Sequence, residues 1–140
     1  MNNVQKYQNV QVMTSDRVRL VIMLYDGIIR FNTGAQKAIA EGDIESRSYN
    51  INRSLAIVTE LCSSLDMERG GEIADNLFHL YQYGIEQLNS ANLNNDSKPI
   101  DVFNRIINEL KQGWEAISES KAEAPVVAAP EERRSISYGV

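Results

Sequence analysis

Few side chains in this sequence belong to the types that carry out catalysis. The 140 residues include one histidine, His79, and one cysteine, Cys62. A two-metal centre in a helical protein is built from glutamates and Glu-x-x-His pairs, but the residue three before His79 is Asn76. The sequence also lacks a Cys-x-x-Cys pair, a Gly-x-Ser-x-Gly turn and a phosphate loop ending in Gly-Lys-Ser or Gly-Lys-Thr. We therefore expect no enzyme activity, no metal site and no cofactor.

His79 still permits one kind of chemistry, because some four-helix bundles carry a phosphoryl group on an exposed helical histidine. The helical period places His79 opposite the apolar residues of its segment, and so toward solvent. Phosphotransfer modules usually have a lysine at the position that Gln82 occupies here. A histidine phosphotransfer module is therefore the alternative function, and an ordinary surface histidine is the simpler interpretation.

A glycine pair, Gly70-Gly71, stands in the stretch SLDMERGGEIADNL and raises the question of a phosphate site. The pair follows a helical pattern rather than a strand, and the Lys and Ser/Thr of a phosphate loop are missing. Glu68 and Glu72 flank it and would themselves complement the dipole of the next helix. We interpret the pair as a turn in which glycine allows positive φ values.

Charge and hydropathy limit the class of protein and of partner. The sequence holds 14 Lys and Arg against 19 Asp and Glu, a net charge of -5, so we expect no nucleic-acid partner. A hydrophobic content of 43% fits one soluble domain. The most apolar stretch, 18–31, is interrupted by charges and is shorter than the roughly 20 residues of a membrane span. Without an apolar signal segment at the N-terminus, the sequence predicts a cytoplasmic protein with no membrane insertion.

Four segments show apolar residues at the 3.6-residue helical period, and short polar connections separate them. Neighbouring helices must then run antiparallel. The first should start behind one of three capping residues, Thr14, Ser15 or Asp16. Asp43 should cap the second, and Pro99 suits the first turn of the fourth. We predict an all-α fold, an antiparallel up-down-up-down four-helix bundle, with helices over residues 16–40, 44–66, 72–92 and 99–120.

The two ends of the chain differ from its middle, so we divide it into segment 1–14, bundle 15–120 and tail 121–140. The tail holds two of the three prolines and no helical stripe, which predicts a disordered segment. The N-terminal segment is too polar for a core element, although Tyr7 and Val10 could lay an apolar edge on the bundle. Both end segments are expected to be flexible.

Several large apolar residues fall outside the expected core stripes, including Leu20 and Met23 on the first helix. If the core-facing stripe of a helix is wider than expected, some of these residues are buried in the bundle core. Exposed apolar surface on a soluble protein marks a partner site, and a groove between helices suits a helix or an extended segment. The candidates for such a groove are Ile57 and Leu61 on the second helix and Phe78 and Ile85 on the third.

The pair Asp26-Gly27 is unusual inside a helix, because Gly costs about 1 kcal/mol there relative to Ala and Asp favours helix ends. It indicates either a close approach of another group to the backbone or a tolerated weak position.

Five parts of the sequence together resemble the FliS family of flagellar secretion chaperones. They are Tyr7-Gln8-Asn9, MLYDGIIRF at 23–31, EGDIE at 41–45, SSLDMERGGEIADNL at 63–77 and the late Trp114. The resemblance runs from about residue 5 to residue 117. One departure is Met13-Thr14-Ser15-Asp16, where the family usually has a Thr-Ala-Ser-Pro pattern before its first helix.

The resemblance implies a function that the residues alone do not define. It implies a cytosolic export chaperone that binds the disordered C-terminal segment of flagellin, keeps it from polymerising, and delivers it to the flagellar export apparatus for type III secretion. A disordered client can cover a long surface and still be released. The resemblance also implies that the N-terminal segment, with Tyr7 and Val10, is a removable plug over part of the client groove.

Overall fold

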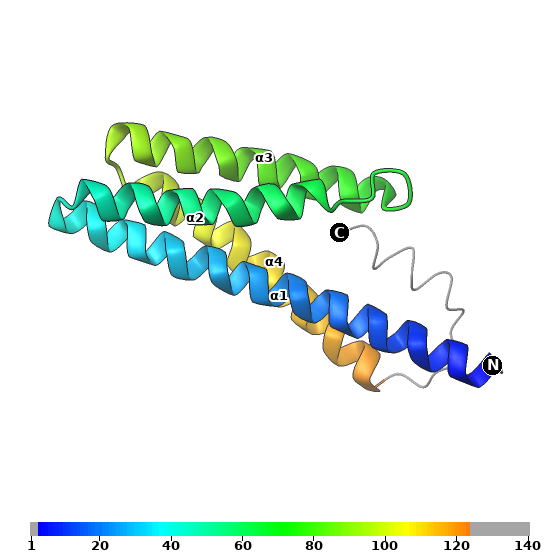
Figure 1. The fold of residues 1–140 in the computed structure, drawn as a ribbon. Coiled ribbons are helices and arrows are strands. Elements are labelled where there is room, and N and C mark those ends of the chain that lie inside the picture. The colour runs from blue at the N-terminus through cyan, green and yellow to red at the C-terminus, as the bar shows by residue number, and fades with distance from the viewer. Residues whose placement is uncertain (1–2, 124–140) are drawn as a thin grey trace.

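The protein folds into four helices. The structure is a computed structural model, which describes the backbone of residues 3–123 and the side chains of residues 16–119. Consecutive helices run antiparallel (Figure 1), and each packs directly on two others, α1 and α3 both on α2 and α4. The described residues contain no strand. The structure confirms the all-α four-helix bundle. Its helices are α1 (Asn3–Glu41), α2 (Ile44–Ser63), α3 (Gly71–Asn94) and α4 (Lys98–Glu123).

The first helix begins far earlier than the sequence predicted. We expected a start near residue 16, but α1 begins at Asn3, and its 39 residues span about 58 Å at 1.5 Å per residue. The physical reason is that residues 3–15 contain neither Gly nor Pro, so nothing interrupts the hydrogen-bond ladder. At the other end, α4 continues to Glu123, three residues into the expected tail. The rest of that tail, 124–140, lies outside the described residues.

The buried stripe of α2 also differs from the expected one. Leu61 was expected outside the core stripe, but its side chain is fully buried. The stripe runs through Ile51, Ser54, Val58 and Leu61. The sequence pattern did not predict this stripe because Ser54 is polar and polar residues are expected on the solvent side of a helix. The other helices contribute large buried side chains to the same core, among them Tyr25, Ile28, Tyr81, Leu88, Phe103 and Ile107.

Local chemistry explains two of the three connections. Gly42 has φ 72° after α1, and the Asp43 carboxylate then accepts a hydrogen bond from the Ser46 N–H at 3.0 Å, the expected cap of α2. Between α2 and α3, Gly71 has φ 55°, a value that glycine adopts without steric cost. Gly70 has an ordinary helical φ of -74°. The glycine pair is therefore a turn, as predicted, although only its second member uses the left-handed region.

Helices α1 and α2 approach one another closely through two glycines of α1. A Cβ atom placed on Gly27 would lie 3.0 Å from Ile57 Cδ1, and one placed on Gly34 would lie 2.6 Å from Asn50 Oδ1. Gly34 comes seven residues after Gly27 on α1, and Asn50 comes seven residues before Ile57 on α2, as expected for two antiparallel helices. The close approach that Asp26-Gly27 suggested is confirmed.

Asp26 itself has a partner on α4. Its carboxylate lies 2.6 Å from the Lys111 ammonium nitrogen. The hydrogen bond to Asp26 raises the pKa of Lys111, partly offset by desolvation of the lysine. Because both side chains are partly exposed, water screens the pair, and it adds little to stability.

Candidate functional site

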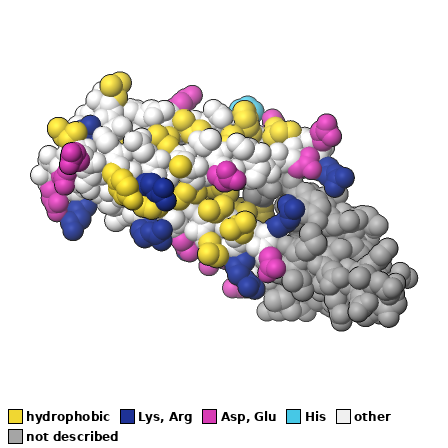
Figure 2. All heavy atoms as spheres, viewed as in Figure 1, with side chains coloured by type: hydrophobic (Ala, Val, Ile, Leu, Met, Phe, Trp, Pro, Cys, Tyr) yellow, Lys and Arg dark blue, Asp and Glu magenta, His cyan; other side chains and the backbone are white. Residues whose placement is uncertain are grey.

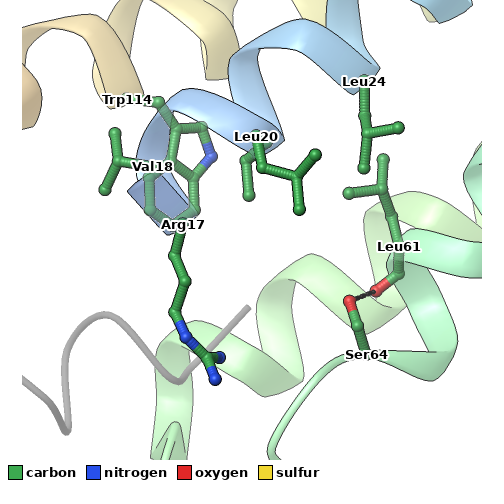
Figure 3. A pocket seen from close by; sticks show the side chains of 8 residues that line it. Arg17, Val18, Leu20, Leu24, Leu61, Ser64 and Trp114 are labelled. Atoms are coloured by element: carbon green, nitrogen blue, oxygen red, sulfur yellow. Dashed lines mark hydrogen bonds between the residues drawn. The ribbon is translucent and has the colours of Figure 1, made fainter. Parts of the chain in front are cut away.

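A cavity of about 370 Å³ opens at the end of the bundle where α2 turns toward α3. This volume falls within the range of small-ligand pockets, about 300–1,000 Å³. In Figure 3 the side chains of Leu24 and Leu61 point toward one another on one side of the view, and Trp114 lies beside Val18 on the other. We call it the Trp114 cavity; it is lined by Arg17, Val18, Leu20, Val21, Leu24, Leu61, Ser64 and Trp114.

Trp114 also lines a second, smaller cavity between α3 and α4. That cavity measures about 230 Å³. Its walls are mostly aliphatic, and they come from the first turns of α3 and from residues 109–117 of α4. The residues are Ile73, Leu77, Glu109, Leu110, Gly113, Trp114 and Ile117. Two concave apolar surfaces therefore share the indole of Trp114, a residue that is 7% exposed as a whole.

A buried hydrogen-bond chain holds that indole in place. The Trp114 Nε1–H donates to Tyr25 Oη at 3.1 Å, and Tyr25 Oη lies 2.6 Å from Tyr81 Oη. The two tyrosine rings meet edge to face, with centroids 6.4 Å apart and planes at 77°. Burial raises the pKa of both tyrosines, although the hydrogen bonds with Tyr81 and Trp114 partly oppose the rise for Tyr25. Three helices thus fix the wall between the cavities.

Apolar side chains continue from the Trp114 cavity onto the outer surface. Leu20 is 53% exposed and Met23 is 62% exposed. Figure 2 shows hydrophobic side chains gathered over α1 and α2 on the visible face, with Lys and Arg side chains beside them. On the same two helices, Arg30 of α1 and Arg53 of α2 place their guanidinium carbons 5.1 Å and 5.6 Å from the ring centre of Phe31. This face suits a partner that is apolar and carries some negative charge or polar groups.

The four groove residues predicted on α2 and α3 lie on two sides of α2 rather than on one surface. Ile57 is half-buried against Gly27 of α1, and Leu61 forms a wall of the Trp114 cavity from within the core. Phe78, 36% exposed, and the half-buried Ile85 stand seven residues apart on α3. They share an edge with Gln82, whose side-chain amide donates to Cys62 Sγ of α2 at 3.4 Å.

Two surfaces therefore flank α2. We call them the α1–α2 surface (Leu20, Met23, Leu24, Ile57) and the α2–α3 surface (Cys62, Phe78, Ile85). Sequence reasoning noted Leu20 and Met23 as apolar residues outside the core stripe but did not assign them to a groove. The predicted site residues Tyr7 and Val10 lie on α1, and their side chains fall outside the described residues.

His79 lies on the outside of α3, as expected. Its side chain is 72% exposed, and its Nδ1 lies 2.8 Å from the backbone oxygen of Asp75 one turn earlier. The Asp75 carboxylate lies 3.8 Å from the same nitrogen, and the Phe78 ring meets the imidazole edge to face. These are the local contacts of an ordinary surface histidine. Within residues 3–123 no helix is long and apolar enough to cross a membrane. Among the described side chains, those of residues 16–119, no group of three or more His, Cys, Asp or Glu gathers as a metal site would.

The fold and its cavities define an antiparallel helical bundle with apolar surfaces of the kind that accept a partner segment. Comparison with known proteins is consistent with that class. The sequence model of the family described as "Flagellar protein FliS" matches residues 1–121. The chain belongs to the FliS family.

Three curated relatives illustrate the match. The flagellar secretion chaperone FliS of Campylobacter jejuni is 36% identical over 118 residues, which is 84% of this chain and 92% of the relative. The flagellar secretion chaperone FliSB of Pseudomonas aeruginosa is 34% identical over 122 residues, 84% of this chain and 97% of the relative. The flagellar secretion chaperone FliS of Salmonella typhimurium is 33% identical over 108 residues, which is 76% of this chain and 80% of the relative. Neither these relatives nor the geometry of His79 supports the phosphotransfer hypothesis.

Proposed function

We propose that this protein is a non-catalytic export chaperone that binds the disordered C-terminal segment of flagellin. Binding takes place in the cytoplasm and keeps flagellin from polymerising before the flagellar export apparatus secretes it. Membership of the FliS family and the names of the curated relatives, which are flagellar secretion chaperones, support the export role. The resemblance of the sequence to that family supports the choice of client.

The single observation that carries the proposal is the Trp114 cavity with the apolar α1–α2 surface that leads into it. A soluble protein of this size gains nothing for its own fold from leaving Leu20 and Met23 exposed. A client side chain seated in the cavity would remove apolar area from water at about 25 cal/mol per Å². Such burial supplies affinity without demanding a fixed client structure beforehand.

The two surfaces flanking α2 suit a client that is extended or partly helical rather than a compact domain. The helices of the bundle are long, and a segment that crosses α2 can contact both surfaces in turn. A disordered segment loses conformational entropy on binding, which lowers its affinity per unit area and keeps the complex releasable. Release matters because an exported client must leave its chaperone.

The test is isothermal titration calorimetry of the full chain with a synthetic flagellin C-terminal peptide. Leu20→Asp places a charge on the α1–α2 surface, and Phe78→Asp does so on the α2–α3 surface. Each should weaken binding about tenfold or more, since losing the burial of one large apolar side chain costs about 1.5–3 kcal/mol. Leu93→Asp is the matched control, because Leu93 is 86% exposed at the opposite end of α3.

Circular dichroism should show all three variants equally helical. Wild-type protein that fails to bind the peptide would refute the proposal. Equal loss of affinity in Leu93→Asp would show that the two surfaces are not the site. We leave Leu61 out of this set because a charge at that buried position would disturb the core itself.

We also propose, from the family resemblance, that Tyr7 and Val10 act at the edge of the client site. A Tyr7→Ala/Val10→Ala variant separates two roles in the same titration. Tighter binding is expected if these residues compete with the client as a plug. Weaker binding would make them part of the contact surface.

A further inference from the structure

Two arginines from neighbouring helices meet at one aromatic ring beside the α1–α2 surface. The guanidinium carbon of Arg30, on α1, lies 5.1 Å from the centre of the Phe31 ring, and that of Arg53, on α2, lies 5.6 Å from it. Both arginines are exposed, whereas Phe31 is half-buried. Attraction to the ring holds each long side chain in place. Two positive charges are therefore positioned where α1 packs on α2 before any partner arrives.

The two charges are not neutralised by the described part of the chain. Among the described residues, neither Arg30 nor Arg53 forms an ion pair. No Asp or Glu lies within four residues of Arg53 in the sequence. Asp26 is the one acidic residue within four residues of Arg30, and its carboxylate lies 2.6 Å from the Lys111 ammonium nitrogen on α4. Each guanidinium carries five N–H donors, so the pair can receive an anionic acceptor.

The arginine pair is continuous with the apolar surface of α1 and α2. Leu20, Leu24 and Phe31 fall on one stripe of α1, because they stand four and seven residues apart. On α2, Arg53 precedes Ile57 by about one turn. The distance along α1 from Leu20 to Phe31 is about 16 Å at 1.5 Å per residue. A partner segment of about five extended residues therefore covers both.

The charges select one kind of partner for this place. The net charge of -5 on the chain disfavours a polyanion such as nucleic acid or an anionic bilayer. A planar guanidinium matches the geometry of a carboxylate, and the adjoining surface is apolar. Glu60 is exposed on α2, seven residues from Arg53 toward the Trp114 cavity, and it repels a carboxylate nearer that cavity. An acidic side chain flanked by apolar residues therefore suits the arginine end of the surface.

We propose that Arg30 and Arg53 form a carboxylate-binding site that pairs with an acidic side chain of the client segment. That side chain lies about five extended residues from the client residue that covers Leu20. The proposal rests on the proposed function, because it assigns a further part of the same binding surface. Apolar contact alone supplies affinity without direction, whereas a charge pair at one end fixes the register and the orientation of the segment.

The experiment is isothermal titration calorimetry of the full chain with the synthetic flagellin C-terminal peptide. The peptide ends in an amide, so that only acidic side chains carry carboxylates. Arg30→Gln/Arg53→Gln removes the two charges, and Lys98→Gln/Arg105→Gln is the matched control, since it removes the same charge from exposed positions on α4. In about 50 mM NaCl we expect the arginine variant to bind about three- to tenfold more weakly, and the control to match wild type.

Salt and a conservative variant separate charge recognition from packing around Phe31. In about 500 mM NaCl, where screening acts within about 4 Å, the difference between wild type and the arginine variant should shrink below about twofold. Arg30→Lys/Arg53→Lys keeps both charges and should recover most of the affinity at low salt. A loss of affinity that neither salt nor the lysine variant changes overturns the proposal, because the arginines would then act through packing alone.

A second peptide, with its acidic side chains replaced by amides, identifies the group that binds. Wild type should bind it as weakly as the arginine variant binds the original peptide, and the two proteins should not differ toward it. A persistent difference toward this peptide overturns the carboxylate assignment. Circular dichroism confirms that all variants keep the helical content of the wild type.

The remaining outcomes separate this proposal from the proposed function. Equal, measurable binding of the original peptide to wild type and to the arginine variant overturns the carboxylate-binding site and leaves the chaperone function standing. Absence of binding to wild type refutes the proposed function and the site together. A dimer of the free protein in light scattering that Arg30→Gln/Arg53→Gln abolishes also overturns the proposal, because a second copy would then supply the acidic group.

Discussion

Tyr25 of α1 and Tyr81 of α3 join two helices whose backbones are not in direct contact. Helices α1 and α3 lie on a diagonal of the bundle, yet the two phenolic oxygens are 2.6 Å apart at its centre. Trp114 adds α4 through its hydrogen bond to Tyr25. Both tyrosines are fully buried, so this polar chain replaces apolar contacts in the middle of the core. It fixes the relative position of three helices next to the cavities.

Removing the Tyr25 hydroxyl should be more damaging than removing that of Tyr81. Tyr25→Phe leaves the Trp114 N–H and the Tyr81 hydroxyl without their partner, and unsatisfied buried groups cost about 1–3 kcal/mol. Tyr81→Phe keeps the Trp114 bond, so we expect about 1 kcal/mol. Urea unfolding followed by circular dichroism measures both. If Tyr81→Phe lowered the free energy of unfolding more than Tyr25→Phe, the hydrogen-bond chain from Trp114 through Tyr25 to Tyr81 would be contradicted.

The same tyrosines predict how stability responds to alkaline pH. Burial raises the pKa of both above the value of about 10 that tyrosine has in an unfolded chain. Above that pH the unfolded state loses phenolic protons that the folded state keeps, so the contribution of the two tyrosines to the free energy of unfolding should be constant well below pH 10 and fall above it. The limiting slope is about 1.4 kcal/mol per pH unit for each tyrosine.

Urea melts between pH 8 and pH 11 measure that slope, and Tyr81→Phe should reduce it. Lys111 acts in the same direction, because its raised pKa means that the folded state holds its proton more tightly. Comparison with a Lys111→Met variant shows how much of the pH dependence of the free energy of unfolding comes from Lys111. A free energy of unfolding that rises above pH 10 would be incompatible with buried neutral tyrosines.

Gly84 is required by the packing of α3 on α4. A Cβ atom placed on it would overlap the ring of Phe103 at Cε1, and both residues are buried. We expect Gly84→Ala to lower the free energy of unfolding by about 1–3 kcal/mol, as overpacked cores do, despite the better helix propensity of Ala.

Gly113→Ala is the matched control for that substitution. Gly113 is also inside a helix, but its Cβ position meets nothing within 4 Å. Ala should therefore raise the free energy of unfolding by about 0.5–1 kcal/mol. Both values come from urea denaturation. Gly84→Ala behaving like Gly113→Ala would mean that Phe103 moves aside freely.

The cap of α2 gives a prediction about local stability. The Asp43 carboxylate accepts the Ser46 N–H at 3.0 Å, so Asp43→Ala should cost about 1 kcal/mol. Asp43→Asn keeps an acceptor in the same place and should cost only a few tenths of that. Thermal melts of the two variants test the difference. Identical melting temperatures would show that the side-chain bond contributes nothing.

The sequence by itself determined the fold class. Periodic apolar residues, the capping Asp43, the turn at Gly71 and the early Pro99 are local signals, because a helix and its ends depend on residues a few positions apart. The sequence also indicated that something approaches the backbone at Gly27, and its longest motifs identified the family. The sequence before residue 16 also contains no helix breaker, and α1 runs through the capping residues Thr14, Ser15 and Asp16, so the predicted start near residue 16 was wrong.

Only the tertiary structure decided which apolar residues are available to a partner. Ser54 looked like an outward position, and its burial shifts the stripe of α2 so that Leu61 enters the core. Ile57 and Phe78 proved to lie on opposite sides of α2, and Trp114 proved to line two cavities. These outcomes depend on how far each helix is rotated against its neighbours. That rotation is set by long-range contacts such as Gly84 against Phe103 and Tyr25 against Tyr81, which no local period in the sequence encodes.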